Sequence, residues 1–191
     1  MKPKKAPDPK RQLQGKIAKA QGARFEDQLQ ASFDWYDAQG LAAVEKTPEP
    51  LRVARNLGNG KFLAFYEKKA QPDYKGTVRG GRTVNLEAKS TATDRVTQNR
   101  VTEGQWDYLQ DQQRLGALCY VIIGFSSGAV YRLPWSDWVD MKKLFGRKYV
   151  KEEDVQKYKV PEGPQGVLLL LHKNERRKHH DHLLQPPPHD R

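Results

Sequence analysis

Three residues in this 191-residue sequence have types and a spacing that could do chemistry on a phosphodiester. Asp73 follows a proline, and after thirteen intervening residues Glu87 and Lys89 stand two positions apart. Hydrolysis of a phosphodiester is assisted by a hard divalent cation, and such cations prefer carboxylate oxygens. Asp73 and Glu87 could supply these oxygens, while the ammonium group of Lys89 could address the attacking water or stabilise developing negative charge. The pattern therefore indicates metal-dependent hydrolysis.

For this chemistry Glu87 and Lys89 must lie on one face, which they do if their segment is a β-strand. Residues 83–89 alternate between polar and apolar side chains, which is typical of a strand. In such a strand Glu87 and Lys89 share one face, with roughly 6.5 to 7 Å between their Cα atoms. A Glu-x-Lys triplet by itself is more often a solvated strand edge. The strict alternation, the small Ala88 and the upstream Asp73 favour the catalytic interpretation.

The surrounding sequence predicts one α/β domain in which a sheet is flanked by helices. Asn59-Gly60 and Gly80-Gly81 are hairpin turn signals, and Gly116 follows a helical segment. The predicted helices cover residues 18–39, 102–115 and a short stretch around Trp135 and Trp138. The predicted strands cover 41–46, the arms of hairpins at 52–69 and 73–89, 117–125, 129–133 and 167–171, with a polar loop at 90–101.

The net charge of +11 points to a polyanionic partner, but it is unevenly spread. Residues 1–20 carry a net charge of +6 and residues 173–191 one of +2, so the body keeps only +3. We expect residues 1–17 to be a disordered basic arm, residues 18–172 to form the single domain, and residues 173–191 to be a polar tail containing histidine and proline.

Several functional classes are disfavoured by the composition. The longest apolar runs fall short of the roughly 20 residues that span a bilayer, and residues 1–22 lack the apolar segment of a signal peptide, so we expect a cytoplasmic protein without a membrane partner. Cys119 is expected to be a buried hydrophobe with no catalytic role. All five histidines fall in the last 20 residues, with no cysteine nearby, which disfavours a zinc site. No small-molecule cofactor is indicated.

The chemical motif resembles that of a known nuclease family. Asp73-Tyr74-Lys75-Gly76 followed by Asn85-Leu86-Glu87-Ala88-Lys89 is similar to the PD-(D/E)xK core in the form carried by RecU-type Holliday junction resolvases. The likeness extends over roughly residues 20–160 and includes Gly22-Ala23-Arg24-Phe25-Glu26, Lys46-Thr47-Pro48-Glu49-Pro50, Gln105 and the strand at 119–125. The D…ExK pattern is shared by many nucleases, whereas this ordered combination is more specific.

The resemblance implies a restriction-endonuclease-like mixed sheet and a homodimer that cuts four-way DNA junctions in two symmetric places. It implies that Asp73 and Glu87 bind Mg²⁺, for which Mn²⁺ would substitute, and that Lys89 stabilises the transition state. It further implies that Gln105 completes the metal or water shell and that Glu26 reaches in from the first helix. One departure is Pro72, because the family often has a hydroxyl-bearing residue there; any metal contact from Pro72 must use its carbonyl or be absent.

Two of these residues have a simpler interpretation. Thr102-Glu103-Gly104-Gln105 fits a capping box, in which Gln105 caps a helix start. Glu26 taken alone would be a solvated helix residue.

The hairpin at 52–69 occupies the place where RecU-like proteins insert a projecting stalk that enters the junction centre. Its basic residues could hold phosphates and its aromatic residues Phe62, Phe65 and Tyr66 could stack on bases, unless they form core instead. The predicted DNA-binding residues are Arg52, Arg55, Lys61, Lys68 and Lys69 on this hairpin, together with Lys75.

Three functions stay open at this point. The leading one is a structure-selective endonuclease that resolves four-way junctions. The second is a sequence-specific or general DNA nuclease on the same core, because the motif does not dictate DNA shape. The third is a non-catalytic DNA-binding recombination protein, against which the intact Asp73, Glu87 and Lys89 argue.

Overall fold

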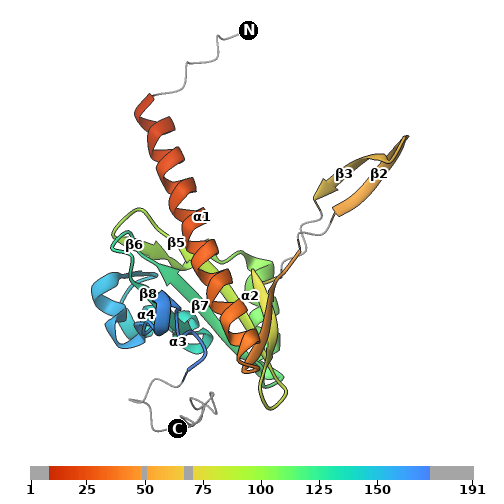
Figure 1. Ribbon diagram of the computed structural model, residues 1–191. Coiled ribbons are helices and arrows are strands. Elements are labelled where there is room, and N and C mark those ends of the chain that lie inside the picture. The colour runs from red at the N-terminus through yellow and green to blue at the C-terminus, as the bar shows by residue number, and fades with distance from the viewer. Residues whose placement is uncertain (1–8, 49–50, 67–70, 173–191) are drawn as a thin grey trace.

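The computed structural model describes residues 9–48, 51–66 and 71–172 (Figure 1). Residues 1–8, the whole predicted tail at 173–191, and Lys68 and Lys69 lie outside the described part, as does the side chain of Tyr66. Within the described ranges no helix is both long enough and apolar enough to cross a bilayer.

A five-stranded mixed sheet forms the centre of the molecule (Figure 1). Its order is β1 (Ala42–Lys46), β4 (Tyr74–Val78), β5 (Arg82–Ser90), β7 (Leu118–Gly124) and β8 (Val130–Pro134). Strands β5 and β7 run parallel, and the other neighbours are antiparallel. The α/β fold class, the hairpin turning at Gly80-Gly81 and the strands around β7 and β8 are thereby confirmed.

Helices cover both faces of this sheet. Helix α1 (Pro9–Ala38) buries Phe25, Leu29, Phe33 and Tyr36 against one face. The other face is covered by α2 (Glu103–Arg114), α3 (Trp135–Val139), α4 (Met141–Phe145) and the 3₁₀ segment η2 (Glu152–Tyr158). Every residue of β7 is buried, which explains why this strand is a continuous apolar run without alternation.

The predicted hairpin at 52–69 is a separate two-stranded sheet that projects from the body (Figure 1). It consists of β2 (Leu51–Gly58) and β3 (Lys61–Tyr66), which pair antiparallel. Asn59 and Gly60 both have positive φ, as the favoured two-residue hairpin turns require. Phe62 and Phe65 are 55% and 60% exposed, so these two aromatic rings are not core residues.

The predicted start of the first helix is wrong. Helix α1 begins at Pro9, so residues 9–17 are helical and not part of a disordered arm. Proline is tolerated in a first helical turn because its missing N–H would have no partner there. Residues 12–20 are all exposed, and a helix that buries no side chain has no apolar periodicity to reveal it.

The predicted last strand at 167–171 is also wrong. Leu168, Leu170 and Leu171 are buried, but their backbone is satisfied mainly by side chains. Leu168 N donates to Ser32 Oγ at 2.9 Å, Leu171 N donates to Tyr36 Oη at 3.0 Å, and the Arg132 guanidinium donates to the Leu170 carbonyl. An apolar run can thus be core without being a strand.

Short irregular elements complete the fold. The predicted polar loop contains β6 (Arg95–Thr97), which pairs with β9 (Tyr149–Lys151). Strands of three residues are too short to show a period. The 3₁₀ segments η1 (Gln98–Arg100) and η3 (Pro164–Gly166) lie in the connections before α2 and after η2.

Candidate active site

The β4–β5 hairpin brings Asp73 and Glu87 together. Tyr74 pairs with Leu86, which places Asp73, one residue before β4, opposite Glu87 on β5. The Asp73 Oδ2 atom accepts a hydrogen bond from Ala88 N at 2.8 Å. The Asp73 carbonyl accepts another from Thr47 N at 2.8 Å, so the end of β1 also holds this residue. The predicted pairing of the two carboxylates is therefore what this geometry gives.

Glu87 is a buried carboxylate with one unsatisfied oxygen. Its residue is 0% exposed, and its Oε1 atom accepts hydrogen bonds from Lys89 Nζ and from Gln105 Nε2, the latter at 2.8 Å. Its Oε2 atom is buried and has no partner among the described residues. Burial, and after it the charge of Asp73, raises the pKa of Glu87 to about 7, against the opposing charge of Lys89. A further positive charge would relieve the mutual repulsion of the two carboxylates.

Gln105 caps the start of α2 and also contacts Glu87. Its Oε1 atom accepts from Thr102 N at 3.1 Å, and the Thr102 hydroxyl accepts from Gln105 N, so the capping box is formed. Its Nε2 atom meanwhile donates to Glu87. The backbone N–H of Thr102 fixes which end of the amide is oxygen, because a donor needs an acceptor. The contact of Gln105 recorded here is thus with Glu87, and its role as a direct metal ligand stays a prediction.

A cavity of about 260 Å³ opens beside these residues and is lined by Glu26, Lys46, Asp73, Lys89 and Arg100, among others. Glu26 lines it from α1, and its partner is Lys46, with 2.6 Å between Lys46 Nζ and Glu26 Oε2. Both side chains of this pair are about half exposed. Glu26 therefore borders the site without contacting either carboxylate directly in this arrangement.

Two cations of this cavity were not among the predicted site residues. Lys46 ends β1, and Arg100 lies in η1, where its Nη1 atom donates to the Ser90 carbonyl at 2.7 Å. Lys46 belongs to the Lys-Thr-Pro segment in which the chain resembles the family, and this likeness could have identified it as a candidate site residue. Arg100 carried no local signal, because only the packing of the loop before α2 brings it to the end of β5.

The carboxylate pair fits a hard divalent cation. An orphaned buried carboxylate oxygen beside a second carboxylate is a donor set that Mg²⁺ or Mn²⁺ would use. Among the described residues no three His, Cys, Asp or Glu side chains gather into one metal-binding group. Mg²⁺ is commonly held by one or two carboxylates and completes its coordination with water and substrate oxygens, so two carboxylates suffice.

The predicted DNA-binding residues are divided between two places. Arg52, Arg55 and Lys61 are exposed on the projecting hairpin. Lys75 lies on β4 in the body, where its Nζ atom donates to Gln71 Oε1 at 2.6 Å and lies 6.0 Å from the centre of the Tyr108 ring. Lys75 is therefore not part of the surface formed by the hairpin.

Two other expectations concern residues outside this site. Cys119 is buried, and burial raises the pKa of its thiol to about 11, which agrees with a structural role. His172 pairs with Tyr36 through 2.6 Å between Nδ1 and Oη; the other four histidines lie outside the described residues.

Several known proteins are similar to this chain. The family model described as Recombination protein U, RecU, matches residues 20–170. The Holliday junction resolvase RecU of Bacillus pumilus is 30% identical over 145 residues, which are 70% of this chain and 69% of that protein. The protein of the same name from a Geobacillus species is 25% identical over 147 residues, or 72% of this chain and 73% of that one. The solved structure of Hjc, a Holliday junction resolvase from Archaeoglobus fulgidus, has a TM-score of 0.42 and 15% identity, covering 70% of this chain and 90% of that chain.

Proposed function

The chain belongs to the RecU family, and from this premise we propose that it is an endonuclease that resolves four-way DNA junctions by paired, metal-dependent hydrolysis. The observation that carries the proposal is the meeting of Asp73, Glu87 and Lys89 at the β4–β5 hairpin. A non-catalytic protein would gain nothing from burying Glu87 with an unsatisfied oxygen, because that arrangement costs folding free energy.

Each residue of the site has a distinct task in this mechanism. Asp73 and Glu87 would hold Mg²⁺, with Mn²⁺ as a substitute, and the bound cation would neutralise phosphate charge and lower the pKa of water. The Ala88 N–H orients Asp73, while Gln105 fixes Glu87. The Lys89 ammonium contacts Glu87 and would stabilise negative charge that develops on the phosphate.

The cations at the rim of the active-site cavity attract the substrate. Lys46 and Arg100 line it together with Lys89, so a phosphate that enters would meet positive charge on several sides. Such contacts position the DNA backbone without reading its sequence. Glu26 would tune Lys46 through their ion pair and is a positioning residue in this proposal.

The projecting hairpin supports a branched substrate. It carries exposed Arg52, Arg55 and Lys61 together with exposed Phe62 and Phe65. An aromatic side chain left exposed on an arm with no core beneath it is suited to stack on bases that are unpaired at a crossover. A second copy of the chain would supply the second nick, because a two-fold dimer matches a pseudo-two-fold junction. We place this activity in the cytoplasm, with DNA as the partner.

We expect that shortening the hairpin removes the preference for junctions. Asn56 pairs with Phe62, so replacing residues 57–61 by Asn-Gly closes the arm with a two-residue turn. Junction affinity should fall roughly tenfold or more, because the variant loses the phosphate contact of Lys61 and its shorter arm carries Phe62 less far toward the junction centre, where stacking on one base is worth about 1–3 kcal/mol. Duplex affinity should change little, because the catalytic hairpin that follows forms its own strand pair.

The measurement is a pair of binding isotherms, for a four-way junction and for a linear duplex of the same sequence, with cleavage of both in Mg²⁺. Removal of residues 1–8, which contain three lysines, is the control and should lower the affinity for the junction and for the duplex by the same factor. If the shortened protein keeps the full preference for junctions, the chain is better described as a general nuclease.

A second expectation separates the two contacts of Gln105. Thr102→Ala removes the hydroxyl that accepts from Gln105 N at the start of α2. Gln105→Ala removes the reciprocal hydrogen bond from Thr102 N and also the hydrogen bond to Glu87. Both variants should lose about 1 kcal/mol of stability. Only Gln105→Ala should also cleave about tenfold more slowly, because Glu87 then loses a fixed position. Thermal unfolding and single-turnover cleavage check this; equal activity of the two variants would reduce Gln105 to a helix cap.

A further inference from the structure

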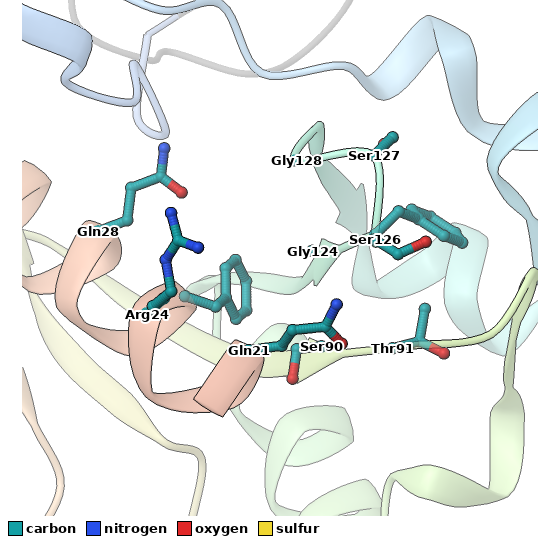
Figure 2. A pocket seen from close by; sticks show the side chains of 11 residues that line it. Gln21, Arg24, Gln28, Ser90, Thr91, Gly124, Ser126, Ser127 and Gly128 are labelled. Carbon is teal, nitrogen blue, oxygen red and sulfur yellow. The ribbon is translucent and has the colours of Figure 1, made fainter. Parts of the chain in front are cut away.

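A second and larger cavity, of about 490 Å³, adjoins the active site (Figure 2). One wall is α1, which contributes Gln21, Arg24 and Gln28, and the facing wall is the turn between β7 and β8 at residues 124–128. Its floor is the end of β5 at Ser90 and Thr91. Figure 2 shows Arg24 and Gln28 side by side on the helix, across the opening from Ser126 and Ser127.

The two cavities are neighbours at the end of β5. Both are lined by Phe25 and Ser90. Helix α1 forms the ridge between them: Gly22 and Glu26, four residues apart, line the active-site cavity, while Arg24 and Gln28 line the second one. A strand of DNA whose phosphate lies at Asp73 and Glu87 and which leaves the site over the end of β5 would pass Arg24.

The polar groups of the second cavity are largely unused by the protein. No hydrogen bond or ion pair of the Arg24 guanidinium is recorded within the part of the chain that the structure describes. The Gln21 Oε1 atom is buried and, among those same residues, lacks a hydrogen-bond partner. Ser127, by contrast, already donates to Glu152 at 2.7 Å.

We propose that this cavity binds a phosphate of the DNA strand that flanks the bond to be cut, with Arg24 as the main contact. This inference rests on the proposed function and names a binding residue that the catalytic mechanism does not use. A fixed phosphate on one side of the cut would set which bond of the strand lies against Asp73 and Glu87. Arg24 is thus a positioning residue for the substrate.

The chemistry of the cavity fits a phosphate better than a base. The guanidinium of arginine matches phosphate oxygens with two parallel donors, and amide groups beside it can add further ones. A stacked base would need an open aromatic face, but Phe25 and Phe125 are only 8% and 6% exposed. The cavity therefore offers donors and charge and very little ring surface.

The test replaces single phosphates of a four-way junction by uncharged methylphosphonates, one at a time, on both sides of the nick in the cut strand. Wild-type protein and Arg24→Gln are compared in affinity and in single-turnover rate. Removing one charged phosphate contact should cost wild type roughly tenfold at one flanking position. Arg24→Gln should show a loss of the same size on the unmodified junction. It should show no additional loss when the phosphate at that flanking position is made neutral.

Lys19→Gln is the matched control, because Lys19 is an exposed cation of the same helix that lines neither cavity. It should keep the wild-type sensitivity to the neutral phosphate. Two results would show that the second cavity is not a phosphate site in a protein that does cut the junction. In one, Arg24→Gln loses as much affinity and rate as wild type when the flanking phosphate is made neutral. In the other, no neutral flanking phosphate lowers the affinity or rate of wild type. If wild type neither prefers nor cuts the unmodified junction, the proposed function itself fails.

Discussion

Glu87→Gln and Asp73→Asn should each abolish cleavage and leave junction binding within about threefold of wild type, because phosphate contacts elsewhere supply most of the affinity. Each change removes one anionic oxygen donor from the place where the cation would be held, while the shape of the side chain is kept. Metal assistance is worth several kcal/mol in the transition state, and each 1.36 kcal/mol is tenfold in rate. We therefore expect losses of roughly 10³-fold or more.

The measurement is single-turnover cleavage of a four-way junction in Mg²⁺ and in Mn²⁺, together with junction binding in a chelator. A shift of the unfolding temperature on adding Mg²⁺ gives a readout independent of activity, since a ligand that binds only the folded state stabilises it. Asp37→Asn makes the same chemical change on the exposed surface of α1 and should behave as wild type. Wild-type nicking by either site variant would disprove the assignment of the two carboxylates.

Local sequence patterns were sufficient to predict elements whose residues follow a fixed period or a fixed turn or cap geometry. The alternation from Thr83 to Lys89 predicted β5 and the face that Glu87 shares with Lys89, because a strand has a period of two. Asn59-Gly60 predicted its turn because both positions need positive φ. The capping box at Thr102 and Gln105 predicted the start of α2.

Local patterns failed where tertiary contacts decide. Residues 12–20 of α1 are all exposed, so no apolar periodicity in that stretch distinguishes an exposed helix from a disordered arm. The run at 167–171 looks like a strand because its leucines are core residues, but Ser32 and Tyr36 accept the hydrogen bonds that a neighbouring strand would accept. The spacing of apolar residues cannot reveal that backbone N–H groups donate to side chains of a helix far away in the sequence.

The same limit applies to the active site. Asp73 and Glu87 were found because one hairpin holds both and its turn is visible in the sequence. Lys46, Arg100 and Arg24 come from three separate elements, and each becomes part of a cavity only through packing around the end of β5. Gln105 is intermediate, since its capping role is local and its contact with Glu87 is not.

Lys89→Ala should slow cleavage by about 10²-fold or more at saturating Mg²⁺, with little change in the Mg²⁺ concentration that gives half the maximal rate. Loss of one preorganised electrostatic contact has typically that effect on a rate. The structure adds a condition to the experiment. Lys89 contacts Glu87 and lowers its pKa, so the variant holds a proton on this carboxylate to higher pH than wild type does.

The comparison must therefore be made well above the Glu87 pKa of about 7, where the carboxylate is ionised in both proteins and a proton no longer competes with the cation. Lys89→Arg is the control, because it keeps the positive charge on the same face of β5 and should recover part of the rate. If Lys89→Ala instead reaches the wild-type rate once enough Mg²⁺ is added, the ammonium group organises the metal site through Glu87 and does not act on the transition state. A loss that persists at every Mg²⁺ concentration and at high pH places Lys89 against the phosphate itself.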